Sequence, residues 1–258
     1  SAFGINVPLS YTQAYASFGI RCVVGNNIPN NTGSLDPIRV HAPDGCILNA
    51  PRPYAVAVRH VIGQMLPDVV LGCIEKMLPG HSPAEGSSSL WNPMIIGGAG
   101  LVDNADYPNL ESFSVTIFHS GGTGALPWKD GQSATAFPSG VRNTPVEITE
   151  SLAPLLFVKK EYRSNSGGAG KFRGGHGQII EIEHRTGAPF AIFAIFDRID
   201  YPARGRQGGQ NGAPGVVQLA SGATLKGKGK QIVPAGDRLI MKLPGGGGYG
   251  SPESRDAL

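Results

Sequence analysis

The feature that most constrains the fold of this chain is its glycine-dense ending, Leu243-Pro244-Gly245-Gly246-Gly247-Gly248-Tyr249-Gly250. The glycines fit G-x-G-x-x-G spacing, and a strand-like run, residues 238–243, precedes them. In a dinucleotide site, however, such a turn opens a helix, and an acidic residue follows roughly 20 positions later. The sequence stops at Leu258, so we expect a glycine-dense turn that closes the fold and not a nucleotide site.

A second glycine segment, residues 166–175, fails the test for a phosphate loop. That loop needs G-x-x-x-x-G-K followed by Ser or Thr. Here Gly170-Lys171 is followed by Phe172, and Asn165 stands at the first glycine position. The chain also lacks a G-x-S-x-G elbow, an H-E-x-x-H motif and cysteines at metal spacing. We therefore predict that this chain itself holds no cofactor and no metal.

Several segments recur in an order and at a spacing that are typical of one family. They are Gly4–Leu9, Ile28–Gly33, Pro43–Asn49, Arg59–Gly63, Asn143–Glu147, Ser166–Gly170, Ala213–Gly215, Pro234–Asp237 and the terminal glycine run. Together they resemble the later part of the hydantoinase B/oxoprolinase family, the partner subunit of ATP-dependent cyclic-amide hydrolases. The resemblance covers nearly the whole chain.

The family's earlier region has no counterpart in this sequence. That region carries an Asn-Asp-Pro-Tyr-type stretch, a Gly-Thr-His-x-x-Asp-type stretch and a paired-histidine stretch, which together look like metal ligands. The resemblance thus implies that the chain is the later half of a longer subunit. It also implies that any divalent metal belongs to the earlier region, and that ATP and Mg²⁺ belong to an A-type partner.

Composition favours a folded protein with many tight connections. A chain of 258 residues that is 40% hydrophobic can bury a continuous core, and its 38 glycines and 21 prolines occur in turn-like clusters without a strict repeat. Three cysteines, with no close pair, suit a reducing compartment. No apolar run reaches the length of a membrane span and no signal segment is present, so we expect a cytoplasmic protein with no membrane contact.

Charge is distributed unevenly along the chain. Residues 1–150 carry a net charge of −4 and residues 151–258 a net charge of +7. The basic half raises the hypothesis of an anionic partner, with Lys226, Lys228 and Lys230 close together. No aromatic residues are interleaved with these lysines, so we favour a solvated hairpin face and predict no nucleic-acid binding.

Two stretches show helical periodicity. Between Ser10 and Val24, apolar side chains recur every three or four residues and predict one buried face, with Ser10 as N-cap: Tyr11, Ala14, Tyr15, Phe18 and Cys22. A second helical stretch, Tyr54–Leu78, is interrupted at Pro67, which suits the first turn of a new helix. Its predicted apolar stripe is Val69, Val70, Cys73, Ile74 and Met77.

Further along, the pattern changes to strands. Residues 81–100 are predicted as loop, whereas residues 113–118, 155–163, 178–184 and 189–196 are predicted as strands. We therefore predict an α+β fold in which a mainly helical part, residues 1–100, packs on a strand-rich, glycine-dense part, residues 101–258, with antiparallel or mixed sheets. The two parts are expected to form one continuous body.

Among the polar residues, His60 and Asp68 form the first candidate pair. The six histidines lie in different elements without ligand spacing, which favours hydrogen-bonded structural roles for them. His60 lies in a family-like segment, and Asp68 follows at i+8, where the two could share a helix face. They would then act as a proton shuttle or a substrate clamp; the alternative is an ordinary polar pair on a helix surface.

Arg142 and Asn143 form the second candidate pair. Arginine can hold a carboxylate or imide oxygens through two parallel hydrogen bonds, and asparagine offers both a donor and an acceptor. The alternative is a turn before a strand, with Pro145 fixing the chain and Asn143 capping it.

The family resemblance implies one function and leaves two alternatives. It implies part of an ATP-dependent hydrolase that opens hydantoin-like or 5-oxoproline-like rings in a hetero-oligomer with an A-type subunit. The first alternative is a subunit of an ATP-dependent ketone carboxylase of the same family. The second is a catalytically silent lobe that serves assembly.

Overall fold

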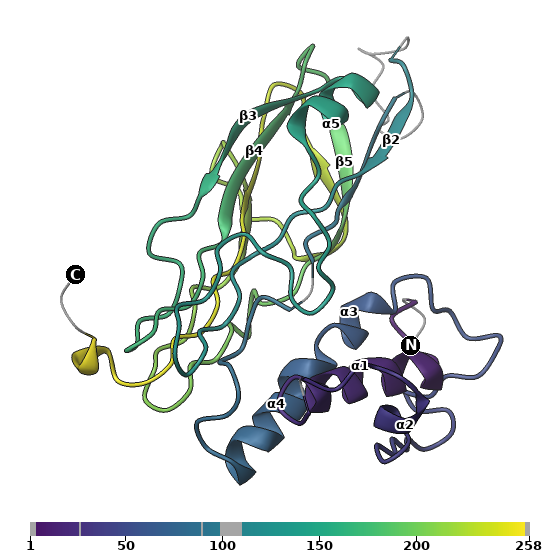
Figure 1. Ribbon diagram of the computed structural model, residues 1–258. Helices are drawn as coiled ribbons and strands as arrows, with labels where there is room; N and C mark the ends of the chain where they lie inside the picture. The colour runs from purple at the N-terminus through teal and green to yellow at the C-terminus, as the bar shows by residue number, and fades with distance from the viewer. Residues whose placement is uncertain (1–3, 26, 89, 99–109, 256–258) are drawn as a thin grey trace. The chain divides into compact units, whose positions relative to one another are not determined.

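The computed structural model describes residues 4–25, 27–88, 90–98 and 110–255 (Figure 1). Its contacts divide the chain into two compact units. The first unit runs to Pro83 and includes Phe137–Ser139, and the second comprises Ala84–Ala136 and the chain from Gly140 onward. The predicted division at residue 100 and the predicted origin in a longer subunit stay predictions.

The first unit is built from four helices: α1 Leu9–Arg21, α2 Thr32–Leu35, α3 His60–Gly63 and α4 Leu66–Met77 (Figure 1). Pro67 lies in the first turn of α4, as predicted. The predicted N-cap of α1 was wrong, because the extended Pro8 holds that position. None of the described helices is long and apolar enough to cross a membrane.

The predicted buried face of α1 was also wrong. The buried residues are Thr12, Ala16 and Gly19, whereas Ala14 and Phe18 are exposed. Small residues win here because α1 packs tightly on α4: a Cβ on Gly19 would lie 3.0 Å from the Val70 Cβ. The Thr12 hydroxyl tolerates burial because it donates to the Leu48 carbonyl at 2.7 Å.

The apolar stripe predicted for α4 is shifted for a similar reason. Of the predicted residues only Ile74 is buried, while Val69 is 58% and Met77 70% exposed. The buried face includes the acids Asp68 and Glu75. The Glu75 carboxylate accepts hydrogen bonds from two backbone amides just beyond the helix, those of Gly80 and Ser82, both at 3.1 Å. Hydropathy patterns miss a face that buries polar groups with their partners.

The second unit contains two four-stranded antiparallel sheets, which confirms the α+β prediction. One sheet has the order β2-β1-β5-β7, from strands β1 Met94–Gly97, β2 Phe113–Thr116, β5 Phe190–Ile195 and β7 Lys228–Val233. The other has the order β3-β4-β8-β6, from β3 Leu155–Tyr162, β4 Gln178–His184, β6 Val216–Leu219 and β8 Leu239–Lys242. Helix α5, Val146–Leu152, precedes β3, and a short 3₁₀ helix covers Pro252–Ser254 (Figure 1).

The strands predicted from alternation are confirmed. β4 shows the clearest pattern, with every second residue buried, and its Ile180 and Ile182 join one core with residues of both sheets. The ring of Trp91 stacks on Phe196 in this core at a centroid distance of 4.3 Å. β1 was missed inside the predicted loop because it has only four residues. β7 was also missed; it is an edge strand, and its lysines are exposed, which protects a sheet edge from further pairing.

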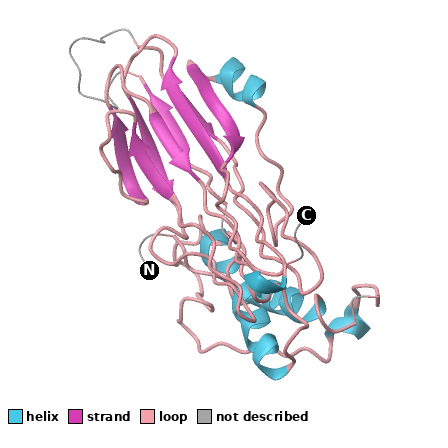
Figure 2. Cartoon of the chain, turned by 90° about the vertical axis from the view of Figure 1, so that its left-hand side faces the viewer, coloured by secondary structure: helices cyan, strands magenta, loops and turns pink. Residues whose placement is uncertain are grey.

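The terminal glycines do not form the predicted turn. Residues 244–248 are extended and lie among five other non-strand segments, residues 84–86, 121–125, 166–175, 203–205 and 210–213. We call these six segments the glycine layer; they run among the loops that continue from the strands (Figure 2). A Cβ on Gly245 would lie 1.8 Å from the Ser166 oxygen, and one on Gly246 would lie 1.9 Å from the Thr123 oxygen. Glycine is needed here for close backbone approach, since positive φ begins only at Gly250.

We predict that Gly246→Ala destabilises the second unit by more than about 3 kcal/mol, because the new methyl group would collide with backbone that has no room to move. Both tryptophans, Trp91 and Trp128, lie in this unit, so tryptophan fluorescence during urea unfolding reports on it. Gly86→Ala is the matched control, since its Cβ would meet no atom closer than 3.3 Å. Equal midpoints for the two variants would contradict this view of the layer.

Candidate functional site

The segment around Arg142 and Asn143 lies in the second unit, before helix α5. Pro145 is extended, with φ −61° and ψ 143°, and α5 begins at the next residue. The alternative of a turn before a strand was therefore wrong, because β3 begins only at Leu155. Asn143 does not cap the helix, since no side chain caps α5.

The Asn143 side chain instead joins three separate stretches of chain. Its Oδ1 accepts hydrogen bonds from the Ser120 amide and from Gln178 Nε2, both at 2.9 Å. Its Nδ2 donates to the Ala134 carbonyl at 3.0 Å. Gln178 also donates to the Ser120 carbonyl at 2.8 Å. Both amide atoms of Asn143 are thus occupied, and the side chain holds the segment in place.

Thr144 fixes the same segment from the other side. Its Oγ1 accepts from the Phe118 amide at 2.8 Å, and its own amide donates to the Phe118 carbonyl at 2.9 Å. Lys160 of β3 donates from Nζ to the Thr144 carbonyl at 2.9 Å. Burial lowers the pKa of Lys160, an effect that the charge of Glu147 opposes. The backbone beside Arg142 is therefore rigidly supported.

Arg142 itself is exposed and lines a hollow of about 260 Å³. The other walls are Ala134–Ala136 and Gly140–Val141, with Asn143 beside Arg142. Ala134 has φ +49°, a conformation that non-glycine residues adopt only under constraint. Within the described ranges no hydrogen bond or ion pair engages the Arg142 guanidinium. Its planar fork of donors suits a carboxylate or another flat pair of oxygens.

His119 lies one residue before Ser120 and was not singled out by the sequence. It is fully buried, and neither ring nitrogen has a hydrogen-bond partner in the described part of the chain. The predicted hydrogen-bonded role was wrong for this histidine, because its ring meets the edge of Phe157 at a centroid distance of 6.1 Å. Burial, with a smaller contribution from Lys160, lowers the pKa of His119 to about 3. The ring is neutral at physiological pH.

His60 and Asp68 belong to the first unit, unlike the other predicted pair. His60 begins α3 and is half-buried, whereas Asp68 lies in the first turn of α4 and is only 5% exposed. Gln64 and Met65 separate the two helices, so the hypothesis of a shared face on one helix was wrong. Their predicted roles in a site stay predictions.

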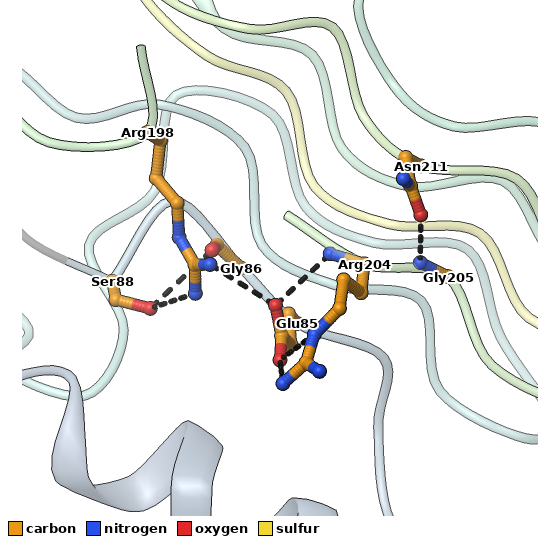
Figure 3. Close-up of polar contacts among 7 residues, drawn as sticks. All are labelled: Glu85, Gly86, Ser88, Arg198, Arg204, Gly205 and Asn211. Atoms are coloured by element: carbon orange, nitrogen blue, oxygen red, sulfur yellow. Dashed lines mark hydrogen bonds and ion pairs between the residues drawn. The ribbon is translucent and has the colours of Figure 1, made fainter. Parts of the chain in front are cut away.

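Sequence reasoning missed a buried ionic cluster around Glu85 (Figure 3). Glu85 Oε2 accepts from Arg198 Nη1 and from the Arg204 amide, both at 3.0 Å. Its Oε1 accepts from Arg204 Nε at 2.8 Å and from Arg204 Nη2 at 2.5 Å. Arg198 also donates to Ser88 Oγ at 3.1 Å. The only signal in the sequence was an acid within the segment Glu85-Gly86-Ser87-Ser88.

The chemistry of Glu85 follows from these contacts. Burial raises the pKa of its carboxyl, but hydrogen bonds from Arg204 and the charges of both arginines outweigh this and hold it below the usual value. Glu85 is thus an ionised carboxylate with its acceptor positions filled, which suits it for positioning and not for proton transfer. Ser88 and Arg198 both have positive φ, 55° and 61°, so this cluster also holds constrained backbone in place.

The glycine segments are engaged by backbone and not by a ligand. The amides of Gly245 to Gly248 donate to the carbonyls of Ala213, Gly175, Glu85 and Gln210. The Gly168 amide donates to the Gly246 carbonyl at 2.8 Å, which ties the second glycine segment to the first. These amides therefore cannot cradle a phosphate. In residues 4–25, 27–88, 90–98 and 110–255, no three His, Cys, Asp or Glu residues gather as metal ligands do.

Comparison with known proteins gives a consistent family match. The model of the hydantoinase B/oxoprolinase family matches residues 1–252. 5-Oxoprolinase PfmaA of Pestalotiopsis fici is 31% identical, across 96% of this chain and 19% of that protein. 5-Oxoprolinase of Saccharomyces cerevisiae is 30% identical, across 95% and 19%. A putative B-type subunit of a D-/L-hydantoinase from a Pseudomonas species is 28% identical, across 98% and 43%.

Two solved structures share the fold. The ATP-dependent caprolactamase from Pseudomonas jessenii superposes with a TM-score of 0.79 at 23% identity, covering 98% of this chain and 45% of that chain. Acetone carboxylase in its nucleotide-free form gives 0.72 at 19% identity, covering 98% and 38%. The chain thus spans less than half the length of each relative named here.

We predict that Glu85→Gln lowers the unfolding free energy of the second unit by about 3 kcal/mol, because Arg198 then stays buried without a counter-charge. The exposed pair Lys159–Glu161 supplies the control Glu161→Gln, which we expect to cost under about 1 kcal/mol. Because the folded-state pKa of Glu85 is lowered, its contribution is complete above the unfolded pKa of about 4.3 and is lost as pH falls below it. Urea unfolding at pH 7 and pH 4, followed by tryptophan fluorescence, measures both effects. A pH-independent gap between parent and Glu85→Gln would refute the assignment.

Proposed function

The chain belongs to the hydantoinase B/oxoprolinase family, and on that premise we propose that it forms part of an ATP-dependent enzyme that opens cyclic amides. The substrates in this proposal are hydantoin-like or 5-oxoproline-like rings. The observation that carries it is the match over residues 1–252, together with relatives named as a 5-oxoprolinase and as a B-type hydantoinase subunit. The relative named as a subunit supports an A-type partner in a hetero-oligomer.

The proposed chemistry divides between two proteins. A ring amide resists attack by water, so the A-type partner would use ATP with Mg²⁺ to phosphorylate the ring carbonyl oxygen. Water would then add to that carbon, the ring C–N bond would break, and phosphate would leave. The products are a carboxylate, the freed amino group, ADP and phosphate. This chain would line part of the site where the ring is opened.

Within this chain, Arg142 is the residue best placed for such a product. Its exposed guanidinium faces a hollow whose support comes from Asn143 and Thr144. A two-pronged hydrogen bond to a ring imide, or to the new carboxylate, would orient the substrate against the activating subunit. In this proposal Asn143 is a positioning residue.

The proposal is tested on the native assembly purified from its source cells with this chain in it. We expect ADP release to depend on hydantoin or 5-oxoproline, with one ring opened per ADP; caprolactam is assayed alongside because one structural relative acts on it. ATP turnover that depends on acetone and bicarbonate would instead support the carboxylase alternative. An assembly without any such turnover would leave the assembly role as the better account and would refute the hydrolase proposal.

Substitutions at the two neighbouring residues should separate binding from support. We expect Arg142→Gln to raise KM at least tenfold and to change stability by less than about 0.5 kcal/mol, since the side chain is exposed. Arg142→Lys should recover part of the loss, because it keeps the charge without the fork. Asn143→Ala should instead cost about 2 to 3 kcal/mol of stability, because it leaves the buried partners of its amide unpaired.

Steady-state kinetics of the assembly and urea unfolding of each variant give these readouts. Lys129→Gln is a control in the same unit, at another exposed basic side chain. If Arg142→Gln leaves KM unchanged, the hollow is not where the substrate binds.

A further inference from the structure

The first unit contains a long hollow that nothing in the proposed chemistry uses. It has a volume of about 780 Å³ and lies between helix α1 and the segment from Asn30 to His41. α1 contributes residues three or four positions apart: Ser10, Gln13, Ala14, Ser17, Phe18 and Arg21. They form the face of α1 opposite to its buried residues. We call this hollow the α1 groove.

Two contacts fix the direction and length of the α1 groove. Gln13 Nε2 reaches the Val40 carbonyl at 3.5 Å, and Arg21 Nε donates to Asn30 Oδ1 at 3.3 Å. The two walls therefore run antiparallel. Ser10 and Arg21 are three helical turns apart, which makes the groove about 16 Å long.

The lining of the groove is apolar in the middle. Phe18 and Leu35, each 38% exposed, face it together with Ile38 and Val40. The Phe137 ring packs on Phe18 at a centroid distance of 5.7 Å and supports that wall. An exposed apolar strip of this kind gains free energy when another apolar surface covers it.

Positive charge stands at both ends of the strip. Arg21 lies at the Asn30 end, and its other donors go to the carbonyls of Val24 and Ile28, so no carboxylate neutralises it. Arg39 and His41 lie toward the Val40 end. Among the described residues that line the groove, Asp36 supplies the single negative charge. The lining thus favours an occupant with an apolar face and acidic ends.

The openness of the groove indicates the kind of occupant. Most of its lining residues are exposed, whereas small-molecule sites typically enclose 70–90% of their ligand. Three turns of length, an apolar strip and flanking charges are the features of a groove that receives an amphipathic helix. We propose that the α1 groove docks an acidic amphipathic helix of a partner polypeptide. The inference does not rest on the ring-opening chemistry.

The test places a photo-crosslinking amino acid, p-benzoylphenylalanine, at Ser17 in the middle of the groove, within the native assembly. Mass spectrometry then locates the linked segment. We expect a partner polypeptide whose linked segment has apolar residues at helical spacing and acids on either side. The same amino acid at Lys76, an exposed position on α4 outside the groove lining, should not link to that segment.

Charge reversal supplies the second part of the test. Arg39→Glu should lower the cross-link yield from Ser17 at least fivefold, and Arg52→Glu, an exposed arginine outside the groove lining, should leave it unchanged. Circular dichroism confirms that each variant stays folded. No polypeptide cross-link, a link to a second copy of this chain or to a segment without acids, or an unchanged yield for Arg39→Glu would each overturn the proposal. ATP-dependent ring opening, assayed on the same preparations, fails or succeeds independently of these yields.

Discussion

The closest constraint in the second unit is contact between backbones without side chains between them. At Gly245 and Gly246 a Cβ would lie within 2 Å of a neighbouring carbonyl oxygen. Segments this close satisfy each other's amides and carbonyls directly, as Gly247 does with Glu85 at 2.8 Å. Such packing gains little from side-chain burial and depends on complete hydrogen bonding. It makes the terminal glycines a structural requirement and uses the amides that a phosphate site would need.

Both polar clusters of the second unit are attached to the glycine layer. Glu85 bonds to the layer through its backbone and holds Arg198 and Arg204 through its carboxylate. Asn143 reaches the layer less directly: it bonds to the Ala134 carbonyl, while the neighbouring Thr135 amide donates to the Gly121 carbonyl. A change in the layer would therefore move both clusters. This coupling explains how segments far apart in the sequence can support one exposed arginine.

The sequence predicted what alternation and local chemistry control, and it failed where tertiary contacts decide. β4 was predicted because every second side chain faces the core. The buried faces of α1 and α4 were not, since Gly19 and Asp68 are buried for close packing and paired polarity, which hydropathy does not register. The glycine tail was predicted as a turn because glycine commonly supplies positive φ, whereas here it supplies proximity. Glu85 was missed because its two partners lie more than a hundred residues away.

The segments that carry the family resemblance mostly perform structural work in this chain. Asn143 ties three stretches together, Ser166 Oγ links the Arg163 carbonyl to the Gly177 amide, and the terminal glycines bond to backbone on every side. A match to these segments therefore identifies the framework more strongly than the substrate. Discrimination between rings falls to exposed groups that the framework supports, such as Arg142 and the hollow beside it. Relatives that act on different substrates can then keep the same backbone network and differ in the walls of that hollow, because those walls carry no part of the layer's hydrogen bonding beyond Ala134 and Thr135.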